Sequence, residues 1–181
     1  MTLKDLYIFK ESVKDGFTQS ELEDLGLLQH DKAHAGDANG RRIAGLEKAL
    51  TKFPSTSHAP LWRGMSKFKD DVSVGKILTL RNYTSFSEHR PIAEQFAKSY
   101  KTNVLMKLLH PAKGFNYGQW LVDDALEWKE KDPQYYHDID GDFQVEGAKD
   151  EAEWIFPQAS SFSVEEISEE NGFKILVVKL K

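Results

Sequence analysis

The sequence contains no cysteine among its 181 residues. This absence excludes disulfide bonds, a thiolate nucleophile and cysteine zinc sites. The chain also lacks an apolar run long enough to cross a bilayer, and its first residues, Met1 to Asp5, lack the apolar block of a secretion signal. We therefore expect a cytoplasmic protein.

The chain also lacks an excess of positive charge. Its net charge of -5 gives no general attraction to phosphate backbones, so we expect no general nucleic-acid binding. Hydrophobic residues make up 40% and charged residues 29%, which is typical of a folded globular protein and excludes wholesale disorder. A length of 181 residues is most simply a single domain.

Recognisable metal sites are lacking as well. His30 and His34 lie four residues apart on a predicted helix, but no third ligand accompanies them. The run Asp138 to Asp142 resembles the start of a calcium loop, yet its sixth position is Phe143 and its twelfth is Lys149. We therefore predict no metal and interpret the acidic run as a solvated turn.

Helical patterns dominate residues 1–57. Residues Thr18 to Glu21 have the form of a capping box, which predicts the start of a helix that continues through Leu28. A further helix is predicted between Ile43 and Phe53, where apolar residues at spacings of three and four form one stripe, and it should end at Pro54. This portion we interpret as a helical N-terminal part of one 1–181 domain.

Strand patterns dominate residues 58–181, which we interpret as the strand-rich core of the domain. We predict strands at 61–64, 72–80, 104–108, 162–167 and 173–180, the last apolar enough on both faces to be central. A helix should follow Pro91, and the aromatic, acidic segment from Pro111 to Asp142 should be partly helical at best. Helices first and strands afterwards indicate an α+β fold.

The most distinctive motif is the run from Glu151 to Pro157. If it is an extended strand, Glu151 and Glu153 point to the same face and can act on one small ligand. Two acids side by side repel each other, which is typical of sites that perform acid chemistry. The alternative is a pair of exposed glutamates on an edge strand.

Two other elements complement these acids. Arg63 offers a planar fork of donors for phosphate, and a hydroxyl cluster of Thr84, Ser85 and Ser87 can orient a carboxylate or contact a ribose. Together the three elements describe a site that cleaves a glycosidic bond in a phosphorylated nucleoside, and NAD fits best because its leaving group is already cationic. Singly, Arg63 can equally be part of an ion pair, and the serines can cap the helix at Pro91.

In this order, Arg63-Gly64, Ser85-Phe86-Ser87 and Glu151-Ala152-Glu153 resemble the Arg, Ser-Thr-Ser and Glu-x-Glu signature of mono-ADP-ribosyltransferases. Within that family the chain is most similar to the small enzymes of T4-type bacteriophages. They share its Arg-Gly-x-Ser-Lys, Phe-Asn-Tyr and Glu-x-Glu-Trp-x-x-Pro runs, found here at 63–67, 115–117 and 151–157. The resemblance covers about residues 60 to 165.

The resemblance implies two packed, mostly antiparallel sheets with NAD bound between them. It implies that Arg63 holds a phosphate of NAD and that the Gly64 backbone lies near the nicotinamide amide. Phe96 is included among the NAD-binding residues, and aromatic side chains between Phe115 and Trp128 are expected near nicotinamide.

The resemblance also assigns the reacting groups. Ser85 should orient Glu153, which binds the ribose and stabilises the oxocarbenium-like transition state, and Ser87 should support the local turn. Glu151 should orient and deprotonate the nucleophile, while a loop from Gly147 to Asp150 presents the target protein.

Two details affect these assignments. Phe86 replaces the central residue of the Ser-Thr-Ser motif, and a shift of register would make Thr84 the orienting hydroxyl. A glutamate at position 151, instead of glutamine, favours arginine over asparagine as the acceptor.

The implied activity is transfer of ADP-ribose from NAD to host proteins, with RNA polymerase or ribosome-associated proteins as possible acceptors. An NAD glycohydrolase, with water as acceptor, is the first alternative. The second is a non-catalytic phage protein that binds a host factor through its N-terminal helices.

Overall fold

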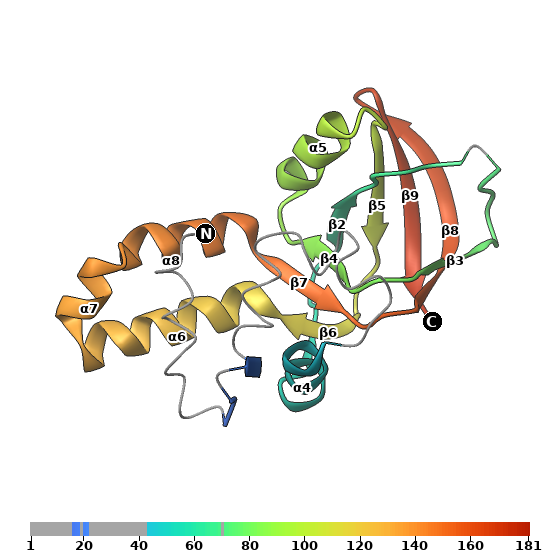
Figure 1. The fold of residues 1–181 in the computed structure, drawn as a ribbon. Helices are drawn as coiled ribbons and strands as arrows, with labels where there is room; N and C mark the ends of the chain where they lie inside the picture. Colours follow the sequence, from blue (N-terminus) through green and yellow to red (C-terminus); the bar gives the residue numbers. More distant parts are fainter. Residues whose placement is uncertain (1–15, 19, 22–42, 70) are drawn as a thin grey trace.

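The structure is a computed structural model that describes residues 16–18, 20, 21, 43–69 and 71–181. Two parts are visible in Figure 1: a curved sheet with short flanking helices, and a helical arm that extends from it. The helices are α4 (Ala44–Lys52), α5 (Arg90–Ser99), α6 (Tyr117–Lys131), α7 (Pro133–Asp138) and α8 (Gly141–Glu151). The strands are β1 (Ser55–Thr56), β2 (Leu61–Gly64), β3 (Ile77–Leu80), β4 (Thr84–Ser87), β5 (Val104–Leu108), β6 (Lys113–Asn116), β7 (Glu153–Phe156), β8 (Ser160–Glu170) and β9 (Phe173–Leu180).

The nine strands form a mixed sheet in the order β1-β6-β7-β4-β2-β5-β9-β8-β3. Every neighbouring pair is antiparallel except β5 and β9, which run parallel. β9 lies between β5 and β8, as its continuous apolar sequence predicts. The expected α+β class with mostly antiparallel pairing is therefore confirmed.

The sheet has two halves that meet between β2 and β4. These two strands share one registered pair, Trp62 with Ser87, whereas β2 and β5 share four. Strands of both halves contribute to one buried cluster, in which the ring of Phe86 packs 5.3 Å from Phe156 and 5.7 Å from Phe162. The two expected sheets are thus continuous at one narrow junction and packed together by a shared core.

Two N-terminal predictions, the capping box and the helix before Pro54, are confirmed. The Thr18 N–H donates to the Glu21 carboxylate at 2.8 Å and the Glu21 N–H to the Thr18 hydroxyl at 3.3 Å, a reciprocal capping box. Helix α4 ends at Lys52, two residues before Pro54, and its Leu46 is buried against residues of the sheet. The continuation of the capping-box helix through Leu28 lies outside the described residues, as does the pair His30 and His34.

The prediction for residues 111–142 is wrong. Residues 117–151 form three consecutive helices, α6 to α8, which we call the helical lobe (Figure 1). The lobe has its own apolar core, built from Val122, Ala125, Trp128, Tyr136, Ile139 and Val145. The strand predicted for 72–80 is shorter than expected, because it begins at Ile77, after a turn at Gly75.

Candidate active site

Strand β4 brings the three sequence motifs together. On one side, the Arg63 guanidinium on β2 donates through Nη1 to the backbone carbonyl of Ser85 at 2.9 Å. On the other side, β4 pairs with β7 so that Ser87 lies opposite Glu153 and Ser85 opposite Ile155. Residues that are 90 positions apart in the sequence, Arg63 and Glu153, are therefore attached to the two edges of one short strand.

The two glutamates do not share a strand, so that prediction is wrong. Glu151 is the last residue of helix α8 and Glu153 is the first residue of β7. Ala152 between them has a left-handed backbone with φ of 40°, and its N–H donates to Ala148 O at 3.0 Å. The acids are separated by a helix end and not by strand alternation. The expected loop at 147–150 is likewise part of α8.

The segment Ser87-Glu88-His89 holds this turn through four hydrogen bonds. The Ser87 hydroxyl donates to the Glu151 carbonyl at 2.6 Å, and the Glu88 N–H donates to the Ala152 carbonyl at 3.1 Å. Trp154 Nε1 donates to the Glu88 carboxylate at 2.8 Å, and His89 Nε2 lies 3.2 Å from the Lys149 carbonyl. The Ser87 hydroxyl therefore bonds the backbone of this turn.

Glu88 and His89 were not identified from the sequence. Their partners are backbone or indole groups 60 or more residues away, so no local motif signals them. Their contacts make them positioning residues for the turn that carries both acids.

Helix α6 approaches the same turn through a glycine. A Cβ added to Gly118 would lie 2.9 Å from the Glu153 backbone nitrogen and 3.1 Å from Ala148 O. The first distance is shorter than real Cβ atoms show and the second is tighter than most Cβ contacts, so glycine allows a closer approach here than any other residue. The start of the helical lobe is thus packed directly on the backbone of the acid pair.

Helix α5 packs on the arginine strand in a similar way. A Cβ on Gly64 would lie 2.4 Å from Ala93 O and 2.6 Å from Ala97 N. Phe96, on the same helix, is 45% exposed, and its ring stacks on Tyr100 with centroids 6.2 Å apart. The Cβ of Phe96 would be 2.9 Å from a Cβ added to Gly64. Phe96 therefore lies beside Gly64, and its ring reaches the surface.

Arg90, at the start of α5, packs on the ring of Trp62, the residue that precedes Arg63. Its guanidinium lies 5.1 Å from the ring centroid of Trp62 and donates to Glu94 at 2.8 Å and to Glu170 at 2.9 Å. Burial lowers the pKa of Arg90, but the bonds to the two carboxylates raise it more. The cation over Trp62 is therefore permanent.

The alternative in which Thr84, and not Ser85, orients Glu153 has less support from the geometry. The Thr84 hydroxyl donates to Asn82 O at 3.0 Å, and Thr84 pairs with Phe156 instead of Glu153. Phe86, the departure from Ser-Thr-Ser, is a buried core residue that leaves both serines on the other face of β4. The motif's central position is thus used for packing.

The aromatic side chains of 115–128 have a packing role. Phe115 and Trp120 lie in the buried cluster that also contains Leu46 of α4, and Trp128 lies in the core of the helical lobe. Their exposures are 1%, 8% and 6%, respectively. Side chains this buried have little surface for a ligand, so the structure does not support the expectation that they lie near nicotinamide.

Among the residues that the structure describes, no group of three or more histidine or acidic side chains is arranged to hold a metal ion. Within those same residues, no helix is both long enough and apolar enough to pass through a bilayer.

Comparison with known proteins identifies the fold and the family. A family model described as Bacteriophage T4 Mod ADP-ribosyltransferase matches residues 4–178. The solved structures that match include exoenzyme S from Pseudomonas aeruginosa, in complex with human 14-3-3 protein beta and bound to carba-NAD. It is 12% identical, with a TM-score of 0.57 over 97% of this chain and 80% of that chain.

Two further solved structures are similar. The Vis toxin, an ADP-ribosyltransferase from Vibrio splendidus, is 16% identical, with a TM-score of 0.51 over 100% of this chain and 74% of that chain. The C3 exoenzyme of Clostridium limosum is 15% identical, with a TM-score of 0.51 over 98% of this chain and 92% of that chain. A comparison with curated proteins gave no match. These structures confirm the expected ADP-ribosyltransferase fold.

Proposed function

Because the chain belongs to the bacteriophage T4 Mod ADP-ribosyltransferase family, we propose that it transfers ADP-ribose from NAD to arginine side chains of host proteins. One observation carries the proposal: Arg63 and Glu153 are joined to the two edges of β4, through the Ser85 carbonyl and opposite Ser87. Both residues are thereby held next to β4, where Arg63 would bind a phosphate of NAD and Glu153 the ribose.

NAD is the proposed substrate, and the charges of the site suit it. The Arg63 guanidinium, oriented by its bond to Ser85 O, would bind a phosphate of the pyrophosphate group. Gly64 on β2 and Phe96 on α5 lie next to each other and would contact the nicotinamide half of NAD. No metal takes part in the proposed reaction.

In the proposed reaction the bond between ribose C1′ and the nicotinamide nitrogen breaks, and nicotinamide leaves with the electron pair as a neutral molecule. The Glu153 carboxylate would hold the ribose 2′-hydroxyl and stabilise the positive charge that develops on the ribose. Ser85, on the same face of the facing strand as Ser87, would orient this carboxylate.

Glu151 would serve the acceptor. It would orient an arginine nitrogen toward C1′ and accept the proton that this nitrogen loses as the new bond forms. Its position at the carboxyl end of α8 favours a cationic acceptor, because the helix dipole is negative there. This is the reason to prefer arginine over a neutral amide.

The experiment is incubation of the full chain with labelled NAD and a bacterial lysate. We expect labelled protein bands with wild type and a loss of about 100-fold or more with Glu153→Gln, which keeps the side-chain shape but removes the charge. Mass spectrometry of the bands identifies the acceptor protein and residue, with RNA polymerase and ribosome-associated proteins as the first candidates. Fractionation of infected cells tests the proposed host cytoplasmic location.

Other outcomes separate the alternatives. If Glu151→Gln abolishes protein labelling but spares nicotinamide release, Glu151 acts on the acceptor as proposed. If wild type releases nicotinamide without labelling any protein, the chain is an NAD glycohydrolase. If NAD is not consumed under any condition, the proposal is wrong and a binding role through the N-terminal portion gains support.

A further inference from the structure

The strand that begins with Glu153 rests on a buried cluster of its own. Ile155 is fully buried, lies opposite Ser85 of β4, and points to the same face of β7 as Glu153. Figure 1 shows α4 beside β6, at the base of the helical lobe. Side chains from α4 and its N-cap, from β6 and α6, and from the residue before β4 surround Ile155; they are Ile43, Leu46, Ala49, Tyr83, Phe115, Tyr117 and Trp120. We call this cluster, with Ile155, the α4 core.

Tyr83 joins α4 to the start of β4. Its side chain is 1% exposed, and it directly precedes Thr84, the first residue of β4. The Tyr83 hydroxyl accepts from the Ile43 N–H at 2.9 Å and donates to the Glu47 carboxylate at 2.7 Å. A buried hydroxyl that is bonded on both sides fixes its neighbours. The position of α4 is therefore coupled to the strand that carries Ser85.

Phe17 packs on the α4 core from outside. It is partly buried, and its ring stacks on Phe53 with centroids 5.9 Å apart. The same ring meets Trp120 edge-on, with centroids 5.8 Å apart. We call Phe17 and the described residues around it, 16–18, 20 and 21, the N-terminal anchor.

Lys48 of α4 holds the N-terminal anchor at two points. Its Nζ donates to the Gly16 carbonyl at 2.6 Å and to the Glu21 carboxylate at 2.7 Å. Nζ also lies 5.3 Å from the centroid of the Phe17 ring. The Glu21 carboxylate accepts from the Thr18 N–H as well, so the capping box is connected to α4. Polar contacts at the two ends of the anchor therefore keep the Phe17 ring in place.

Trp120 connects the N-terminal anchor to the acid pair. It lies on α6, two residues after Gly118, the glycine that packs on the Glu153 backbone. Its ring also lies 6.3 Å from that of Phe115, which pairs with Ile155 of β7. The anchor therefore supports α6 and β6 at the places where both contact β7.

We propose that Phe17 is a positioning residue for the transfer reaction, which acts through Trp120 and α6 on the turn that carries Glu153. By holding this turn, Phe17 keeps the Glu153 carboxylate where it stabilises the charged ribose, and so raises kcat. Binding of NAD does not depend on it, because Arg63 lies on β2, across β4 from Glu153. The effect on kcat rests on the proposed function, whereas the effect on the turn can be measured without NAD.

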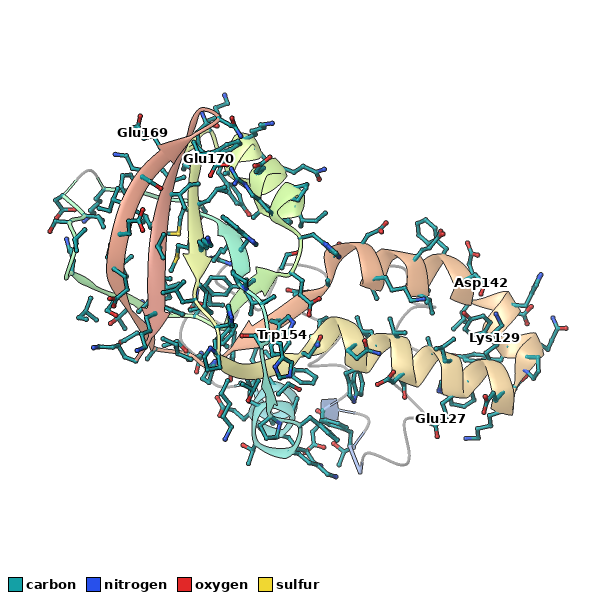
Figure 2. All side chains as sticks on the ribbon, turned by 180° about the vertical axis from the view of Figure 1, so that it is seen from behind. Glu127, Lys129, Asp142, Trp154, Glu169 and Glu170 are labelled. Atoms are coloured by element: carbon teal, nitrogen blue, oxygen red, sulfur yellow. The ribbon has the colours of Figure 1, made fainter. Side chains whose placement is uncertain are left out.

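The first experiment follows the indole N–H signals of the four tryptophans by NMR, assigned with single Trp→Phe replacements. Trp154 Nε1 donates to Glu88 at 2.8 Å, where the sheet meets the helical lobe in Figure 2, so its signal reports on the turn. Phe17→Ala should shift the signals of Trp120 and Trp154 and speed solvent exchange of the Trp154 proton about 5-fold or more. The Trp62 signal, on β2, should stay in place.

Kinetics of the full chain separate positioning from binding. Phe17→Ala should lower kcat about 5-fold or more for both ADP-ribose transfer and nicotinamide release, with KM for NAD within about 2-fold of wild type. Phe17→Tyr keeps the ring and should restore kcat. Lys48→Met keeps the apolar stem but loses the bonds to Gly16 and Glu21, so it should change kcat and the Trp154 signal in the same direction. It carries the test if Phe17→Ala does not fold.

Phe173→Leu is the matched control. Phe173 begins β9 in the other half of the sheet and is 5% exposed. Lys98 Nζ lies 5.5 Å from the centroid of its ring, as Lys48 lies near Phe17. This replacement should lower stability in chemical denaturation but leave kcat and the Trp154 signal as in wild type.

An unchanged Trp154 signal in the folded variants would overturn the proposal, because the influence of Phe17 would then end at Trp120. Equal falls in kcat for Phe17→Ala and Phe173→Leu would also overturn it, since a general loss of stability would explain both. A raised KM for NAD with unchanged kcat would have the same consequence. If wild type consumes no NAD but the Trp154 signal moves as expected, the proposed function fails and the positioning through α6 stands.

Discussion

The sheet and the helical lobe differ in how they are related to the site. The sheet supplies Arg63, Ser87 and Glu153 from three adjacent strands, with backbone pairing that fixes their spacing. The lobe supplies Glu151 from a helix end and otherwise contributes packing and surface charge. The difference teaches that the two acids, although two residues apart, belong to different structural units that meet at Ala152.

The largest expected effect is on the sheet side. Arg63→Lys should lower kcat/KM for NAD about 100-fold, for both transfer and nicotinamide release, because a lysine cannot bond Ser85 O and a phosphate with the same planar fork. Steady-state kinetics with NAD as the varied substrate measure this. If this variant lost transfer but kept nicotinamide release, Arg63 would act on the acceptor. The division of roles between the sheet and the helical lobe would then be wrong.

The contact between the two units should be the next most sensitive. Gly118→Val should lower the free energy of unfolding by about 1–3 kcal/mol, because its side chain would collide with the Glu153 backbone. Chemical denaturation measures the change. Gly147→Ala is the matched control, because its Cβ meets nothing within 4 Å and should stabilise α8 by about 0.5–1 kcal/mol. Equal effects at both glycines would contradict the close packing at Gly118.

A smaller effect is expected at Glu88. Glu88→Ala removes the acceptor of Trp154 Nε1 and should cost about 1 kcal/mol of stability, with a several-fold fall in kcat as the acid pair loses its orientation. Glu88→Gln keeps an acceptor oxygen and should restore most of kcat. A fall in stability alone, with kcat unchanged in both variants, would make Glu88 purely structural.

The smallest effect at neutral pH is expected inside the lobe. Tyr136 is buried and donates to Asp142 at 3.0 Å, near the end of the lobe that Figure 2 shows with Lys129 and Asp142. Burial, and then the bond to Asp142, raises the pKa of Tyr136 to about 12. Tyr136→Phe should therefore lower stability by about 1 kcal/mol or less at pH 7.

The same residue predicts a pH dependence. A raised pKa means that folding favours the neutral hydroxyl, so its contribution is complete below the unfolded value of about 10 and is lost as pH rises to about 12. Between these pH values wild type should lose stability relative to Tyr136→Phe, as denaturation at stepped pH would show. Parallel curves for the two proteins would contradict the raised pKa.

The sequence predicted the sheet better than the lobe. The strand at Leu61–Gly64, the helix at Pro91 and the central position of β9 follow from local apolar patterns, and the structure confirms them. The lobe was missed although Val122, Ala125 and Trp128 repeat every three residues, because acidic and aromatic residues interrupt the stripe. Its helices are stabilised mainly by a small core formed among themselves.

The acid pair shows a different limit. Extending the strand of Trp154 to Phe156 backward predicted two glutamates on one face, but α8 continues to Glu151. What ends the helix there is a set of bonds from Ser87, Glu88 and His89, which are about 60 residues away. Tertiary contacts of this kind leave no local signal in the chain.

Ala152 carries a further consequence. An alanine with φ of 40° holds a backbone shape that glycine adopts without strain. Replacing it by glycine should therefore relax the peptide and, at the same time, loosen the angle between the Glu151 and Glu153 carboxylates. Catalytic accuracy and thermal robustness would then change in opposite directions through a single methyl group.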